Sequence, residues 1–159
     1  MMQAERKNKI KKILFIILCM LFVVLVFMAG LSLWRVNNIK KEQRAQVYRD
    51  YDEFRGLFNQ AAVSYQSKKT EDAGYFFMQA LQCSTQIRKT AKKCKTDGEN
   101  NDLEDIMGQI YLAVHFSEGK WSEYSTDTEY LLNLANLWFA ESNHEDPFQI
   151  YFLDFPPIY

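Results

Sequence analysis

Three adjacent residues, His144, Glu145 and Asp146, have side chains of the types that bind metal ions or transfer protons. Neighbouring side chains point in different directions, so these three do not by themselves form a metal site or an acid–base pair. His115 falls on the face of a predicted helix, where a partly buried histidine needs no catalytic role. No HExxH, GxSxG, phosphate-binding loop or dinucleotide-binding fingerprint occurs. We therefore predict no catalytic residue, no metal and no cofactor; an enzyme acting near a membrane through His115 or His144 is the alternative.

The cysteines are the other residues with reactive side chains. Cys19 lies in an apolar stretch, whereas Cys83 and Cys94 lie on one predicted helix. Eleven residues of helix separate the Cα atoms of this pair by about 16 Å, well beyond the separation of about 7 Å that a disulfide spans. We expect buried thiols, with an intermolecular disulfide or a zinc site as alternatives.

The element that positions the rest of the chain is the segment 13–34, which carries no charge and is almost wholly apolar. At about 1.5 Å per residue, a helix of this length spans about 33 Å, enough to cross a hydrocarbon core about 30 Å thick. Trp34 ends the segment where interfacial aromatic residues are common. A cleaved signal peptide is the alternative, although its apolar region is normally only about 7 to 15 residues long. We predict a single transmembrane helix embedded in the lipid bilayer.

The charges are divided unevenly between the ends of the chain. Residues 1–12 carry five basic side chains and one acidic one, out of 19 basic and 20 acidic side chains in all. The basic start suits an anionic inner leaflet, whereas the mildly acidic remainder argues against a nucleic-acid partner. Because Lys9, Lys11 and Lys12 adjoin the apolar segment, we predict a cell-membrane protein with a cytoplasmic N-terminus and an extracytoplasmic C-terminal domain.

A seam of apolar residues after the transmembrane segment recurs at spacings of four and three, the period of an amphipathic helix. The seam comprises Val47, Tyr51, Phe54, Phe58, Ala61 and Tyr65. It covers fewer than three heptads and mixes aromatic with small side chains, so we expect it to pack within its own domain. A homodimer formed by self-association through Val47, Tyr51, Phe54, Phe58 and Tyr65 is the alternative.

Three further helices are predicted after the seam. Thr70 and Asp102 are expected to cap the first two, and Thr126 with Glu129 forms a capping box for the last. The fold class is therefore all-α: a single N-terminal transmembrane helix continues into a small antiparallel bundle of about four helices, arranged as αα-hairpins. The chain divides into a basic N-terminal tail (1–12), a transmembrane helix (13–34), a stalk (35–46), a helical domain (47–143) and an irregular aromatic C-terminal tail (144–159).

The C-terminal tail is rich in aromatic side chains, which are costly to leave in water at about 1.5 to 3 kcal/mol each. The candidates for binding a partner protein are Phe148, Tyr151, Phe152, Phe155 and Tyr159. We favour packing of the tail across the bundle, with a groove on a partner as the alternative. The last four residues, 156–159, match the PPxY motif that WW domains bind as a polyproline II helix, a match easily met by chance.

Two resemblances to known families accompany these patterns. Ala62 and Tyr65, followed by Ala73, Phe77 and Ala80, resemble the helix pair of a tetratricopeptide repeat, although the turn is one residue short and no 34-residue period follows. That resemblance implies that the helix pair binds another protein.

The second resemblance is a loose one to the membrane-proximal helical half of the spore-germination proteins that partner a cortex-lytic enzyme. It covers about residues 13–140 and rests on the order of the parts, on residues 105–116 and 126–138, and on Gly108, Thr126, Glu129 and Tyr130. No counterpart of that family's larger C-terminal part follows in this sequence. The resemblance implies a partner-stabilising role outside the cell membrane.

Together these patterns favour a non-enzymatic, membrane-anchored helical domain that binds or positions another protein of unknown identity. The contact is expected at the hairpin surface or at the aromatic tail. A self-associating structural membrane protein and an accessory factor that stabilises a cell-envelope enzyme are the alternatives.

Overall fold

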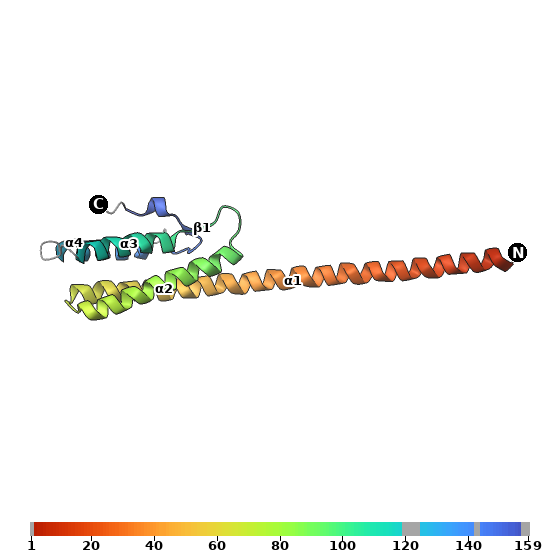
Figure 1. Ribbon diagram of the computed structural model, residues 1–159, viewed down its shortest axis with the longest axis horizontal. Coiled ribbons are helices and arrows are strands. Elements are labelled where there is room, and N and C mark those ends of the chain that lie inside the picture. The colour runs from red at the N-terminus through yellow and green to blue at the C-terminus, as the bar shows by residue number, and fades with distance from the viewer. Residues whose placement is uncertain (1, 119–124, 142–143, 157–159) are drawn as a thin grey trace. The chain divides into compact units, whose positions relative to one another are not determined.

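The computed structural model describes residues 2–118, 125–141 and 144–156, and among these it describes residues 2–10, 115–118 and 125–127 by their backbone alone. Its elements in chain order are α1 (Met2–Gln66), α2 (Thr70–Cys94), β1 (Asn100–Asn101), α3 (Leu103–Glu118), α4 (Ser125–Ala140), β2 (Gln149–Ile150) and the 3-10 helix η2 (Phe152–Asp154) (Figure 1). The predicted all-α fold class is confirmed. The chain forms two structural units, residues 1–40 and residues 41–159, and α1 contributes to both.

The first unit contains the predicted transmembrane segment. Residues 13–34 are helical throughout, and their large apolar side chains are exposed, as those of a lipid-facing helix are. The hydroxyl of Ser32 donates a hydrogen bond of 2.9 Å to the carbonyl oxygen of Met28, so this polar side chain is satisfied within the helix. The helix near the N-terminus is thus long and apolar enough to cross a membrane.

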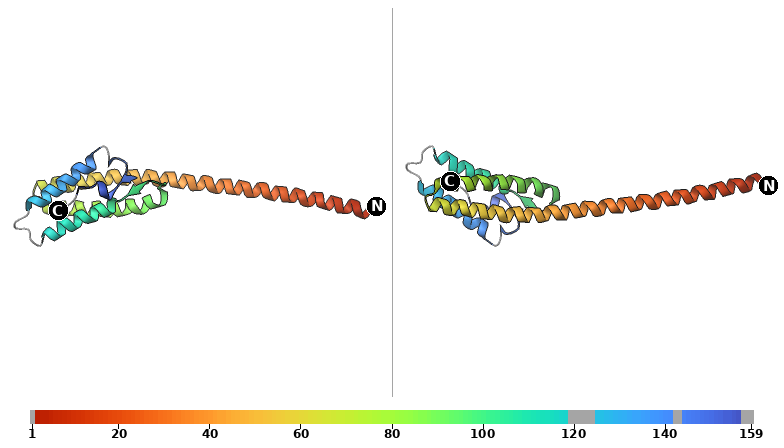
Figure 2. Two further views of the ribbon diagram at one scale, coloured as in Figure 1. Left: turned by 90° about the horizontal axis from the view of Figure 1, so that it is seen from above. Right: turned by 90° about the horizontal axis from the view of Figure 1, so that it is seen from below.

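The second unit has an aromatic core that joins its helices. Phe54 and Phe58 of α1 contact the ring of Phe139 on α4, with ring centroids 5.0 and 5.1 Å apart. On the other side, the centroid of Phe58 lies 6.2 Å from that of Phe77 on α2, and Phe77 stacks on Tyr111 of α3. In Figures 1 and 2, α2 runs beside the C-terminal part of α1. The apolar seam predicted from the sequence therefore lies in the centre of a helical bundle.

The ends of the helices differ in detail from the sequence predictions. Thr70 is the first residue of α2 and not its cap, and the residue before it makes no capping hydrogen bond with its side chain. The turn before α2 closes instead through the backbone, with Lys68 at a φ of 57° and the amide of Lys69 bonded to the carbonyl of Ser64. Likewise α4 begins at Ser125, one residue before the predicted capping box, and ends at Ala140.

The C-terminal tail is more regular than predicted. β2 pairs in parallel with β1, so that Asn100 lies opposite Gln149 and Asn101 opposite Ile150. The amide of Asn100 donates to the carbonyl of Phe148, and the amide of Asp102 donates to that of Ile150. The described part of the tail is therefore attached to the loop between α2 and α3, and it belongs to the same unit as the helices.

Candidate functional site

Arg44 of α1 holds both the loop before β1 and the C-terminal tail. Its guanidinium donates two hydrogen bonds of 2.7 Å to the carboxylate of Glu99, and it lies 4.0 Å from the centre of the Phe148 ring. We call these three residues the Arg44 cluster. Arg44 lies within the predicted stalk, residues 35–46, and belongs to the second structural unit.

The ion pair of the Arg44 cluster predicts a pH-dependent stability. The hydrogen bonds from Arg44 lower the pKa of Glu99 to about 2, whereas an unfolded glutamate has a pKa of about 4.3. A lowered carboxyl pKa stabilises the fold above the unfolded pKa, and this stabilisation is lost as the pH falls from about 4.3 to about 2. We expect Glu99→Gln to lower the free energy of unfolding at pH 7 by about 1 to 2 kcal/mol, since the pair is partly exposed.

Denaturant titrations of the full chain at pH 7 and at pH 3 measure this effect. The difference between the wild type and Glu99→Gln is expected to shrink at the lower pH. Glu145→Gln, at an exposed carboxylate, serves as the control. A difference that stays constant over this range contradicts the role assigned to Glu99.

Of the five candidate partner-binding residues of the tail, the structure describes four, of which two are buried and two are not. Phe148 and Phe155 are buried in the core of the second unit, so they are corrected here to packing residues. Tyr151 is half-buried, and its hydroxyl donates a hydrogen bond of 3.0 Å to the carbonyl of Gly98. Phe152 remains 40% exposed. Tyr159 lies outside the described residues, as does most of the PPxY motif.

Among the described residues of the tail, Leu153 has the most exposed large apolar side chain, and no pattern in the sequence indicates it. Its side chain is 93% exposed at the middle of η2. The turn is fixed on both sides, because the amide of Phe152 donates a hydrogen bond of 3.0 Å to Asp102, and the indole of Trp138 donates one of 3.2 Å to the carbonyl of Asp154. η2 therefore presents an apolar side chain on an ordered turn.

His144 is packed against aromatic side chains of the second unit. Its ring stacks on Trp138 with centroids 3.6 Å apart, and its carbonyl accepts a hydrogen bond of 2.6 Å from the hydroxyl of Tyr51. Burial lowers the pKa of His144, which favours the neutral imidazole, and the nearest carboxylate oxygen, on Glu141, is 3.9 Å away. Among the described residues, no three histidine, cysteine or acidic side chains gather as metal ligands would. The side chain of His115 lies outside the described residues.

The candidate self-association residues lie inside the second unit. Val47, Tyr51, Phe54 and Phe58 are buried against other helices, and Tyr65 is half-buried at the end of α1. A second copy would reach the four buried residues only if the bundle opened. The buried seam residues thus form an intramolecular contact, the packing that the sequence analysis favoured over self-association.

Two of the three cysteines are also packing residues. Burial raises the pKa of Cys83 to about 11, and its thiol lies 3.2 Å from the carbonyl oxygen of Asp50 on α1. Cys94 is buried at the end of α2. Such thiols are poor nucleophiles because the reactive species is the thiolate.

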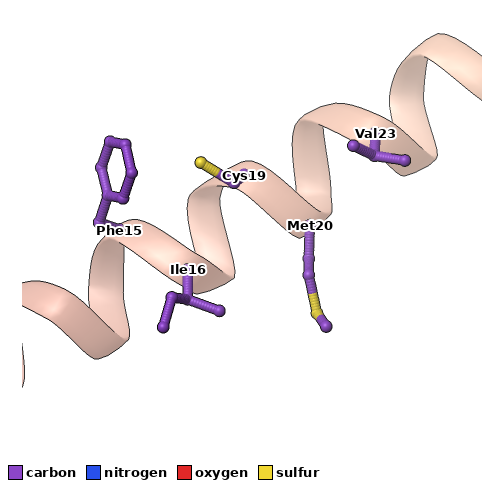
Figure 3. Close-up of a pocket in the computed structure, with 5 residues that line it drawn as sticks. All are labelled: Phe15, Ile16, Cys19, Met20 and Val23. Atoms are coloured by element: carbon purple, nitrogen blue, oxygen red, sulfur yellow. The ribbon is translucent and has the colours of Figure 1, made fainter.

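The surface of the predicted transmembrane segment carries an apolar groove. Figure 3 shows Phe15, Ile16, Cys19, Met20 and Val23 projecting from successive turns of α1, with space between their side chains. No charged residue lines this groove, so it is suited to lipid tails or to another apolar helix.

Comparison with known proteins gives no family assignment. No protein-family model matches the chain, and neither a curated protein nor a solved structure matches it. The resemblances to spore-germination proteins and to tetratricopeptide repeats therefore remain predictions from the sequence.

Proposed function

We propose that this chain is a single-pass membrane protein whose helical domain binds another protein and has no catalytic activity of its own. The apolar segment 13–34 supports the membrane anchor. The exposed Leu153 on the ordered turn η2 is the observation that carries the protein-binding role.

The turn is suited to binding because it is held in place without a partner. Hydrogen bonds from Phe152 and Trp138 fix its two ends, and Phe155 anchors it in the core. A fixed loop loses little conformational entropy when a partner binds. Burial of Leu153 and of the exposed part of Phe152 then contributes up to about 1.5 to 3 kcal/mol for each side chain. We call this pair of residues the tail contact.

Photo-crosslinking in intact membranes tests the tail contact. A photoreactive phenylalanine analogue replaces Leu153 in the full chain, and the matched control places it at Tyr75, an exposed aromatic residue of α2. We expect a discrete adduct with a second protein from position 153 and none of the same mass from position 75. Adding Phe152→Asp is expected to remove the adduct, because the charge disrupts the apolar contact.

The mass of the adduct separates the hypotheses. An adduct of twice the mass of the chain favours the self-associating membrane protein and overturns binding to a different protein. Equal adducts from both positions, or an adduct that survives Phe152→Asp, contradict a specific contact at η2.

The proposal includes an extracytoplasmic domain and a cytoplasmic N-terminus. The basic residues next to the apolar segment support this orientation, and the resemblance to spore-germination proteins agrees with it. Protease added to intact cells is expected to digest the second unit and to leave the membrane segment. Protection of the second unit until the membrane is permeabilised contradicts the orientation and places the PPxY motif in the cytosol.

A further inference from the structure

The end of α2 carries a cluster of positive charges that have no ion-pair partner among the described residues. No acidic residue occurs between Asp72 and Asp97. The nearby Arg88 forms ion pairs of 3.1 and 2.6 Å with Glu104 and Asp105, but no described carboxylate forms one with the four exposed lysines that follow. These side chains, which we call the lysine group, are Lys89, Lys92, Lys93 and Lys95.

The lysine group lies on the side of α2 that faces away from the core. Ile87, Ala91 and Cys94 are buried, whereas the lysines between them are exposed. Cations are favourable near the C-terminal end of a helix, but this effect is limited to the last turn, and Lys89 precedes that turn. Because like charges three or four residues apart repel one another, the lysine group is stabilised when an anionic surface approaches it.

The lysine group lies level with the beginning of the second unit. α2 runs antiparallel to α1 (Figure 1), and the thiol of Cys83 lies 3.2 Å from the carbonyl oxygen of Asp50. Residues of both helices advance by about 1.5 Å each. Lys92 follows Cys83 by nine residues, and Lys41 precedes Asp50 by nine, so these two lysines lie at the same level of the bundle.

Few acidic side chains oppose the lysine group from the segments next to it. In the loop after α2, Glu99 is paired with Arg44, which leaves Asp97 exposed. In the first turns of α1 within the second unit, Glu42 is exposed beside Lys41. The end of α2 and the two segments that adjoin it therefore carry a net positive charge.

The length of chain before Lys41 keeps this end of the second unit near the membrane surface. Lys41 follows Trp34, the predicted interfacial residue, by seven residues. This stretch is helical, so it covers about 10 Å. The headgroup region is about 5 to 8 Å thick on each side of the bilayer, and the Debye length at physiological ionic strength is about 8 Å. The second unit therefore begins within electrostatic reach of the headgroups.

We propose that the lysine group binds the anionic phospholipid headgroups of the membrane in which the chain is anchored. The inference rests on the membrane anchor of the proposed function, but it requires neither the tail contact nor a particular orientation of the chain. The second unit as a whole is acidic, because residues 41–159 carry 12 basic and 19 acidic side chains. An anionic surface repels most of the unit and attracts the lysine group, so the contact orients the unit on the membrane.

NMR of the full chain in lipid nanodiscs tests this contact. A phosphatidylcholine with a nitroxide on its headgroup broadens the resonances of nearby amides. Nanodiscs of phosphatidylcholine alone are compared with nanodiscs that also contain phosphatidylglycerol. We expect the amide of Lys95 to broaden more in the anionic nanodiscs, and that of Ser67, before the other end of α2, to change little. Salt at about 1 M is expected to remove the difference, because the Debye length then falls to about 3 Å.

Variants of single lysines test whether the charge of the lysine group is responsible. One basic side chain near an anionic surface changes the ratio of bound to free molecules about fivefold, so Lys93→Gln is expected to lower this ratio about fivefold. Lys69→Gln, at an exposed lysine just before the other end of α2, is the matched control with the same change in net charge. Lys93→Arg keeps the charge and is expected to keep the binding.

The anchor and the lipid contact fail in different ways. A chain that does not insert into neutral nanodiscs contradicts the anchor. If the chain inserts but the amide of Lys95 broadens equally in neutral and anionic nanodiscs, the lysine group does not bind anionic lipid. Equal losses in Lys93→Gln and Lys69→Gln assign the attraction to the overall charge of the unit, and a difference that persists at about 1 M salt assigns it to apolar contacts. Each of these last results overturns the proposal.

Discussion

Replacing Phe139 with alanine is expected to destabilise the helical domain by about 3 to 5 kcal/mol, as for other buried aromatic residues. The ring is 2% exposed. It packs edge-on against Phe54 and Phe58 of α1, with centroids 5.0 and 5.1 Å away, and also against the neighbouring ring of Trp138. Truncation leaves a cavity that these rigid rings cannot fill, so the cost includes lost contacts as well as lost burial.

Denaturant unfolding of the full chain, followed by circular dichroism, measures the change. The matched control is Leu137→Ala, two residues away on α4, where the side chain is 65% exposed and the expected change is within about 0.5 kcal/mol. Similar losses for the two variants contradict the position of α4 against α1. A large loss for Leu137→Ala with a small one for Phe139→Ala indicates that the buried face of α4 is reversed.

The packing of Phe139 also shows why much of the bundle follows from the sequence. Phe54 and Phe58 recur with the period of a helix, and so do Phe77 and Ala80 on α2. Each period places its apolar residues on one face, and a face of this width has to be buried against other helices. The all-α class and the internal position of the seam are therefore determined by local spacing.

The contacts that join distant parts of the chain have no comparable local signal. Arg44 donates a hydrogen bond to Glu99, which lies 55 residues later in the chain. The two-residue strands β1 and β2 pair only because the tail returns to the loop between α2 and α3. Asp102 illustrates the difference: it does precede α3, as predicted, but its carboxylate accepts a hydrogen bond from the amide of Phe152. The tertiary fold, and not the local sequence, determines which of these distant residues pair.

The candidate functional residues also include some that the sequence indicates and others that only the tertiary fold reveals. An aromatic tail is visible in the sequence, but burial separates Phe148 from Phe152, and only the fold decides which ring is covered. Leu153 likewise becomes a candidate through its exposure on η2.

Replacing Phe148 with alanine tests whether the tail belongs to the core, and the expected loss of stability is again about 3 to 5 kcal/mol. The ring is completely buried, lies under the guanidinium of Arg44 and has its centroid 5.7 Å from that of Tyr48. Its carbonyl accepts the hydrogen bond from Asn100 that begins the pairing of β1 with β2. Loss of the ring therefore weakens both the Arg44 cluster and the attachment of the tail.

Phe152→Ala is the matched control within the same tail, because this ring is 40% exposed and makes the smaller contribution to packing. We expect Phe148→Ala to lower the midpoint of denaturant unfolding much more than Phe152→Ala. Similar small changes in both variants contradict the packing of the tail and return Phe148 to the candidates for binding a partner.

A double-mutant cycle with Arg44→Ala separates the contact between Arg44 and Phe148 from the burial of the ring. A guanidinium over an aromatic face contributes about 0.5 to 1 kcal/mol at a partly exposed site. The combined variant is therefore expected to lose that much less stability than the sum of the two single variants. Additive losses show that the ring acts through burial alone, and the tail then depends on the core packing of Phe148 and on the pairing of β1 with β2. A coupling of the expected size shows that Arg44, ten positions after Trp34, holds the tail. The Arg44 cluster then joins the beginning of the second unit to its end.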